Sequence, residues 1–129
     1  MAAGLAQRML EGHGEAESAG IAPYGERAAA ETIRVMRQEG IDLSDHKPRD
    51  VTALSLEDYD YVVAMEPYVH RHLQERCRVA PSKLISWDID DPYGQGIEAY
   101  KESLQSIRSH LEDFFAHLGF PSSRFPEPD

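Results

Sequence analysis

The residues best suited to acid–base chemistry in this chain are three aspartates, Asp88, Asp90 and Asp91, placed before its longest helical pattern. Asp91 stands directly before Pro92-Tyr93-Gly94. A carboxyl group held on such a loop is suited to donating and accepting protons. Taken alone, Asp-Pro-Tyr-Gly is typical of an ordinary turn. The three aspartates together are also compatible with an acidic loop or a weak cation site, although no second cluster of ligands accompanies them.

Cys77 is the only cysteine in the sequence and is therefore the only candidate for a thiolate nucleophile in it. A thiolate that attacks phosphate needs an arginine to hold the phosphate oxygens through two parallel hydrogen bonds. Lys83 stands six residues after Cys77, and an ammonium group cannot offer that fork. The segment does not follow a predicted strand either, so we interpret Cys77 as a plain thiol. A single cysteine excludes an intrachain disulfide and a cysteine-built zinc site.

The composition indicates one globular domain. The 129 residues are enough for a single core and too few for two domains of ordinary size. The formal net charge of −10 argues against a nucleic-acid partner, which would require a basic face. No apolar run approaches the length of a membrane span, and the start of the chain does not resemble a secretion signal. We therefore expect a cytoplasmic protein without a membrane or nucleic-acid partner.

Helical and strand patterns alternate along the chain, which predicts an α/β domain with a parallel sheet. Helices are expected at residues 1–10, 26–39, 67–76 and 97–118, and strands just before Ser18 and at 59–65 and 83–87. The last helix has the strongest pattern, with apolar residues at helical spacing: Ile97, Tyr100, Leu104, Ile107, Leu111, Phe114 and Leu118.

Local signals mark where two of these elements begin or end. Gly40 is expected to end the second helix, since glycine is the usual residue just beyond a helix C-terminus. Thr52 or Ser55 is expected to cap a short helix before the strand at 59–65. The proline-containing segment 119–129 is expected to be a disordered tail, which leaves residues 1–118 as the domain.

Five segments, in order, resemble the low-molecular-weight protein tyrosine phosphatase family up to about Leu118. They are Met1-Ala2-Ala3-Gly4-Leu5, Ser18-Ala19-Gly20, Gly40-Ile41-Asp42-Leu43-Ser44 leading to His46 and Arg49, Tyr59-Asp60-Tyr61-Val62-Val63-Ala64-Met65, and Asp91-Pro92-Tyr93-Gly94 with Tyr100 beyond it. Each match is weak by itself. Their shared order and distances make the resemblance specific.

The resemblance implies a reaction and a role for four residues. The reaction is hydrolysis of a phosphorylated protein, on phosphotyrosine or phosphoarginine, through a phosphocysteine and without metal or other cofactor. Asp91 is implied to be the general acid and then the base that activates water. Tyr93 is implied to form a wall beside the substrate. Ser18 and His46 are implied to support the phosphate-binding loop from behind.

The family's nucleophile lies in a Cys-x5-Arg loop near its N-terminus, and these 129 residues do not contain that motif. The resemblance implies a three-layer fold with sheet order 2-1-3-4, in which the first, central strand and the loop are missing here. We favour an internal methionine taken as the start over a genuinely shortened, non-catalytic binding or regulatory relative. The chain as given is expected to be inactive.

An alternative hypothesis is that the protein is an arsenate reductase, because thioredoxin-coupled arsenate reductases share the fold that the resemblance implies. Such an enzyme passes electrons through a relay of cysteines, for which Cys77 alone is not enough. The sequence leaves the phosphorylated substrate and the oligomeric state open.

Overall fold

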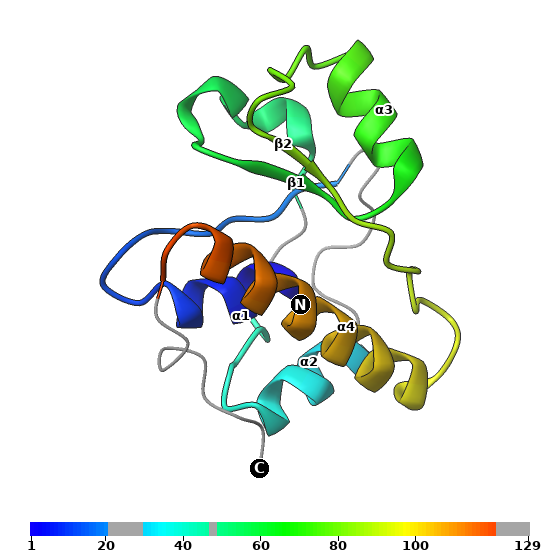
Figure 1. Cartoon of the computed structure of the whole chain (residues 1–129). Helices are drawn as coiled ribbons and strands as arrows, with labels where there is room; N and C mark the ends of the chain where they lie inside the picture. Colours follow the sequence, from blue (N-terminus) through cyan, green and yellow to red (C-terminus); the bar gives the residue numbers. More distant parts are fainter. Residues whose placement is uncertain (21–29, 47–48, 121–129) are drawn as a thin grey trace. The chain divides into compact units, whose positions relative to one another are not determined.

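The computed structural model describes residues 1–20, 30–46 and 49–120. The chain forms two compact units. The helical unit contains α1 (Ala2–Met9), α2 (Ala30–Gln38) and α4 (Ile97–His117). The strand unit contains two single-turn 3-10 helices, η1 (Val51–Ala53) and η2 (Leu56–Asp58), followed by β1 (Val62–Ala64), α3 (Pro67–Glu75) and β2 (Leu84–Ser86) (Figure 1).

The core of the helical unit forms where α4 packs against α1 and α2. Along α4 the buried apolar side chains recur three or four residues apart. The buried apolar residues of the three helices are Leu5, Ala6, Met9, Val35, Met36, Tyr100, Leu104, Ile107, Leu111 and Phe115. The prediction of a long final helix is confirmed. The inward position near its end was wrong, because Phe115 is buried and Phe114 is half-buried. Phe115 continues the spacing from Leu111 by one full turn.

The end of α2 is set by Gly40, as predicted. Its φ of 80° lies in the left-handed region that glycine adopts without steric cost. The Gly40 N–H donates to the carbonyl of Arg37, and the Ile41 N–H donates to that of Met36. These two bonds form the Schellman arrangement and satisfy carbonyls that the helix end leaves open.

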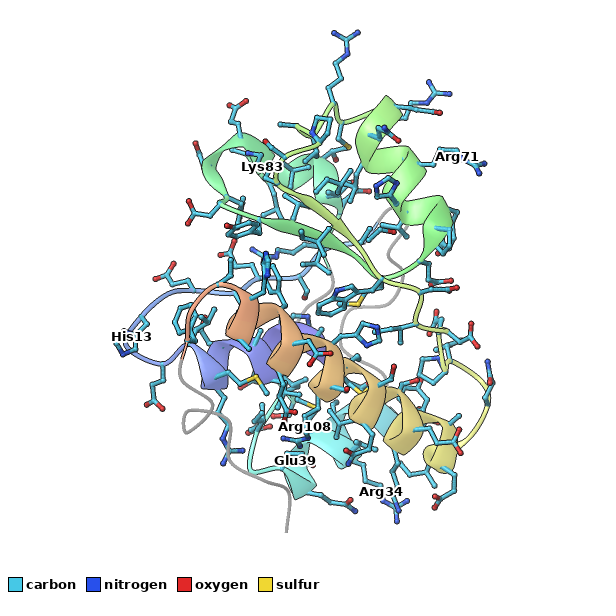
Figure 2. All side chains as sticks on the ribbon, viewed as in Figure 1. His13, Arg34, Glu39, Arg71, Lys83 and Arg108 are labelled. Atoms are coloured by element: carbon cyan, nitrogen blue, oxygen red, sulfur yellow. The ribbon has the colours of Figure 1, made fainter. Side chains whose placement is uncertain are left out.

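A buried charge links α2 to α4. Arg108 is only 6% exposed, and its Nη2 lies 2.7 Å from Glu39 Oε2. Figure 2 shows the two labelled side chains next to each other. Arg108 lies on the same face of α4 as Leu104 and Leu111, so the apolar stripe of that helix contains a cation that the sequence analysis overlooked.

The strand unit is built around a parallel pair. Val62 pairs with Leu84 and Ala64 with Ser86, and α3 is the crossover between the two strands. Both strands were predicted, and both are shorter than expected. The core of this unit gathers apolar residues from strand, helix and loop: Val51, Ala64, Leu73 and Val79.

Two local predictions in this region were wrong. Asp50, and neither Thr52 nor Ser55, provides the side-chain cap of η1, with its Oδ1 accepting from the Thr52 N–H at 2.9 Å. No strand precedes Ser18 among the described residues. The backbone instead makes one isolated parallel bridge, between Gly20 and Asp50.

Within the described residues the sheet has two strands, and β1 has β2 as its single strand neighbour. Residues 26–29 of the predicted second helix and 121–129 of the predicted tail lie outside the described part of the chain. Phe120 is described, and its ring packs against that of Phe115 with centroids 5.6 Å apart. None of the described helices is both long and apolar enough to cross a membrane.

Candidate functional site

The acidic segment follows β2 at the carboxyl edge of the parallel pair. Because β1 and β2 run in the same direction and in register, the residues that follow them meet at this edge. Hydrogen bonds extend the pairing beyond both strands: the Trp87 N–H donates to the Ala64 carbonyl and the Ile89 N–H to that of Met65, each at 2.8 Å. The carboxyl edge is where open α/β sheets place their ligand sites.

The alternation of the segment Trp87-Asp88-Ile89-Asp90 explains how it presents its acids. Trp87 and Ile89 are buried, whereas Asp88 and Asp90 are exposed. This is the period-two pattern of an extended chain with one face on the core. The two apolar side chains therefore anchor the segment and leave its carboxylates facing outward.

Glu66 is a member of this acidic group that the sequence analysis missed. It follows β1 and precedes Pro67 at the start of α3. Burial raises the pKa of the Glu66 carboxyl, and the nearby negative charges of Asp91, Asp90 and Asp88 raise it further. Glu66 thus holds its proton to a higher pH than an ordinary glutamate. Its position directly after a buried strand was the available signal.

Asp91 is exposed and is the last residue of the strand unit. Through their charges Asp91 and Glu66 are electrostatic neighbours at the carboxyl edge of the sheet. A carboxylate that is near other acids on an ordered segment can exchange protons with a substrate and keep a defined position. Asp91 is thus part of a group of carboxyl groups at this edge.

The turn after Asp91 belongs to the helical unit. The Gln95 N–H donates to the Pro92 carbonyl at 2.9 Å, which closes a four-residue turn. Gly94 has a φ of 80° at the third position, as a type II turn requires. Tyr93, at the second position, is 59% exposed. A turn is therefore present, one residue later than the Asp-Pro-Tyr-Gly segment that indicated it.

Ser18 and His46, predicted separately from distant segments, lie together in the helical unit. Ser18 Oγ is 3.5 Å from His46 Nε2, a long contact in a half-buried setting. The His46 N–H donates to the Leu43 carbonyl, so a turn positions the imidazole. Hydrogen bonding from Ser44, with its side chain as the largest contribution, lowers the pKa of Asp42 in the same turn.

Two of the predicted site residues lie together, and a third is an electrostatic neighbour of a residue that was not predicted. Ser18 and His46 contact each other in the helical unit, and Asp91 joins Glu66 in the strand unit. Tyr93 belongs to the helical unit. Within the described part of the chain, no three His, Cys, Asp or Glu side chains are grouped so that they could hold a metal ion. The alternative of a cation site among the aspartates therefore has no geometric support there.

Cys77 lies just after the C-terminus of α3 and is half-buried against the core cluster of the strand unit. Its backbone N–H donates to the carbonyl of His72, so the residue belongs to the helix end. A phosphate-binding thiolate sits on a loop of inward-pointing N–H groups at the start of a helix. Cys77 lies instead at the end of a helix, which supports its interpretation as a plain thiol.

Comparison with known proteins gives a consistent family. The family model for low molecular weight phosphotyrosine protein phosphatases matches residues 1–122. A probable low molecular weight protein-tyrosine-phosphatase, EpsP, from Ralstonia solanacearum is 33% identical over 105 residues, covering 74% of this chain and 70% of the relative. Arsenate reductase 2 from Staphylococcus epidermidis is 27% identical and covers 88% of this chain and 84% of the relative.

The solved structures agree on the fold. The low molecular weight protein tyrosine phosphatase from T. tengcongensis superposes with a TM-score of 0.80 at 29% identity, covering 90% of this chain and 88% of that one. An arsenate reductase in the reduced state superposes with a TM-score of 0.68 at 23% identity. The predicted three-layer α/β fold class is confirmed by these likenesses.

Proposed function

This chain belongs to the low molecular weight phosphotyrosine protein phosphatase family, and we propose that Asp91 is the proton donor and acceptor of its phosphate-transfer chemistry. The observation that carries the proposal is the placement of Asp91 at the carboxyl edge of the parallel pair. It stands on a segment anchored by the buried Trp87 and Ile89. That edge is the usual ligand site of an α/β sheet.

The reaction proceeds in two steps. A cysteine thiolate attacks phosphorus, so a sulfur–phosphorus bond forms and the bond to the leaving oxygen breaks. Asp91 gives its proton to that oxygen and becomes a carboxylate. The carboxylate then takes a proton from water, whose oxygen attacks phosphorus and releases the thiolate. Asp91 thus returns to its starting state, and the products are the free hydroxyl group and phosphate.

The thiolate of this reaction needs a Cys-x5-Arg loop, which these 129 residues do not contain. In our proposal Ser18 and His46 support such a loop, since their contact offers a hydroxyl and an imidazole that can donate to its backbone. Tyr93 offers an exposed ring beside the substrate. The substrate is a phosphorylated protein, with phosphotyrosine and phosphoarginine both compatible. The location is the cytoplasm, and residues 1–118 act as one domain.

The proposal predicts no turnover of p-nitrophenyl phosphate by the 129-residue chain. It predicts that activity appears when the strand and Cys-x5-Arg loop of an active relative are fused ahead of Met1. In that fusion, Asp91→Asn should lower kcat by about 10²- to 10⁴-fold, the usual range for general acid–base catalysis. Asp88→Asn is the matched control, because Asp88 is an exposed acid on the same segment, and its kcat should change little. Equal losses for the two variants would contradict the role of Asp91.

An arsenate reductase is the second candidate, favoured by the Staphylococcus epidermidis relative over 88% of this chain. Arsenate reduction by a thiol relay oxidises cysteines to a disulfide, and Cys77 is the single thiol available. Arsenate consumption that depends on thioredoxin, occurs in the fused chain and is lost in its Cys77→Ser variant would favour this function over the phosphatase. If the fused chain binds a phosphoprotein but does not hydrolyse it, the domain acts as a binding module.

A further inference from the structure

The strand unit contains an open pocket of about 570 Å³ at the edge opposite to the acidic segment. Its walls come from residues 51–57, which lead into β1, and residues 76–83, which lead into β2. Because the strands are parallel, the segments that precede them meet at the amino edge of the pair. The pocket is therefore distinct from the site that contains Asp91.

Part of the pocket lining is apolar, and we call this part the floor. The lining side chains include Val51, Leu54, Leu56, Val79 and Ala80, and both Val51 and Val79 belong to the buried core cluster. Burial in that cluster fixes their positions, so the floor does not depend on mobile side chains. The volume lies in the range of about 300–1,000 Å³ that is typical of small-molecule sites.

The charge of the pocket is the reverse of the charge of the protein. Its lining contains the cations Arg76, Arg78 and Lys83 against the single acid Glu57. The whole chain has a formal net charge of −10. A concentration of cations around an apolar floor raises the local concentration of anions and favours a ligand with a negative group.

The roles of the three cations differ. Lys83 Nζ donates to the carbonyls of Leu56, Glu57 and Tyr59 at 3.1, 3.2 and 3.1 Å, so its hydrogen-bonding capacity is used within the protein. Figure 2 marks Lys83 in the strand unit. This lysine ties the two walls of the pocket together and contributes charge.

Arg76 and Arg78 are the cations that remain for a ligand. Both are exposed, and neither has an ion-pair partner among the described residues. Arg78 has a φ of 54°, in the left-handed region that L-residues with a side chain rarely adopt. A guanidinium group can bind the paired oxygens of a carboxylate or phosphate group through two parallel hydrogen bonds.

We infer that this pocket binds a small organic anion, with its apolar body against Val51 and Val79 and its carboxylate or phosphate on Arg76 and Arg78. A nucleic acid is excluded by the charge of the remaining surface. A long acidic peptide would make little use of the apolar floor. The inference does not depend on the role of Asp91.

The test is a titration of the 129-residue chain with 2-naphthoate, followed by amide chemical shifts in ¹⁵N–¹H spectra. We expect saturable shifts at residues 51–57 and 76–83, and no saturation with the neutral 2-naphthamide. A parallel titration with 1-naphthyl phosphate decides whether the anionic group can also be a phosphate. Shifts centred on Ser18 and His46, or no saturation by 2-naphthoate at millimolar concentration, would overturn the inference.

The variant that tests the site most cleanly is Arg78→Gly. Glycine adopts the φ of position 78 without cost, so the substitution removes the guanidinium and keeps the fold. We expect Kd for 2-naphthoate to rise by about ten-fold or more, as for the loss of a charge-assisted hydrogen bond. Arg71→Ala is the matched control, because Arg71 is an exposed cation of α3 outside the pocket, and its Kd should not change. Equal Kd values for Arg78→Gly and wild type, or binding of hexaglutamate in preference to 2-naphthoate, would refute the site.

Discussion

At the scale of single residues, the acidic edge of the strand unit depends on the contrast between Asp91 and Glu66. Asp91 is exposed, whereas Glu66 is partly buried and is surrounded by the charges of three aspartates. Burial and neighbouring negative charges both favour the protonated form of Glu66 over its carboxylate.

The raised pKa of Glu66 predicts a pH dependence of stability. The native state holds this proton more tightly than the unfolded chain, so the contribution of Glu66 is fully present below its unfolded pKa. It is lost as the pH rises through the higher native pKa. Glu66→Gln removes this loss, so we expect the variant to gain stability relative to wild type as the pH rises through that window.

Urea unfolding of the two proteins at a series of pH values measures the difference. Glu75→Gln is the control, since Glu75 is an exposed carboxylate at the end of α3. A stability difference between wild type and Glu66→Gln that is independent of pH would show that the carboxyl is not perturbed.

At the scale of elements, α4 shows what periodicity can and cannot reveal. The spacing of its apolar residues predicted the helix and most of its buried face. The same spacing contains Arg108 between Leu104 and Leu111, yet an arginine is normally assigned to solvent. The ion-pair partner Glu39, which directly follows α2, offsets the cost of burying Arg108, and a pairing between distant segments is not readable from one sequence.

Breaking this pair is expected to destabilise the protein. Arg108→Ala leaves the Glu39 carboxylate without its cation and opens space beside Leu104 and Leu111. Removal of one partner of a buried pair costs about 3–5 kcal/mol, and we expect the lower end, since the Glu39 side chain is 22% exposed. Chemical denaturation measures the free energy of unfolding. Arg108→Met should lose less because it fills the space, and equal losses for the two variants would argue against a packing contribution.

The end of α2 gives a second prediction at this scale. Gly40→Ala forces a Cβ into the left-handed region at φ 80° and should cost about 1–2 kcal/mol of unfolding free energy. The cost is conformational, because the nearest atom to the new Cβ is Arg8 Nη1 at 3.7 Å. Gly14→Ala is the matched control, because its φ lies outside the left-handed region and a Cβ there would make ordinary van der Waals contact with Leu10 at 3.7 Å; it should change stability by less than about 0.5 kcal/mol. A difference of zero in thermal or urea unfolding would contradict the role of Gly40 as a helix stop.

Short strands were harder to predict than helices for a physical reason. The apolar run 59–65 indicated a strand, but pairing with β2 extends over three residues only. The length of a strand is set by its neighbours, and neighbours are distant in sequence. The cap of η1 was misassigned for a related reason, because Asp50, Thr52 and Ser55 are all good caps and the backbone path decides among them.

At the scale of the whole molecule, the order of motifs identified the family before any coordinates. Ser18 and His46 illustrate this point, since neither residue is informative alone and only the resemblance implied a shared supporting role. The structure adds that the two side chains lie 3.5 Å apart. Glu66 and the basic pocket were not found, because each depends on which segments lie side by side at one edge of the sheet. Sheet edges are assembled by long-range pairing.

The two edges of the β1–β2 pair carry side chains of opposite charge. Acids follow the strands at the carboxyl edge, and cations precede them at the amino edge. We expect the two to be separable by mutation. Arg78→Gly should leave the phosphatase activity of the loop-containing fusion unchanged, and Asp91→Asn should leave 2-naphthoate binding unchanged, both measured on the same protein samples. Loss of both properties in either variant would show that the edges are coupled.

The most direct test of proton delivery by Asp91 uses leaving groups of different basicity. The kcat of the loop-containing fusion and of its Asp91→Asn variant is measured on p-nitrophenyl phosphate and on phenyl phosphate. A basic leaving group needs the proton more, so the defect of Asp91→Asn should be clearly larger on phenyl phosphate than on p-nitrophenyl phosphate. An equal defect on the two esters would mean that Asp91 does not protonate the leaving oxygen.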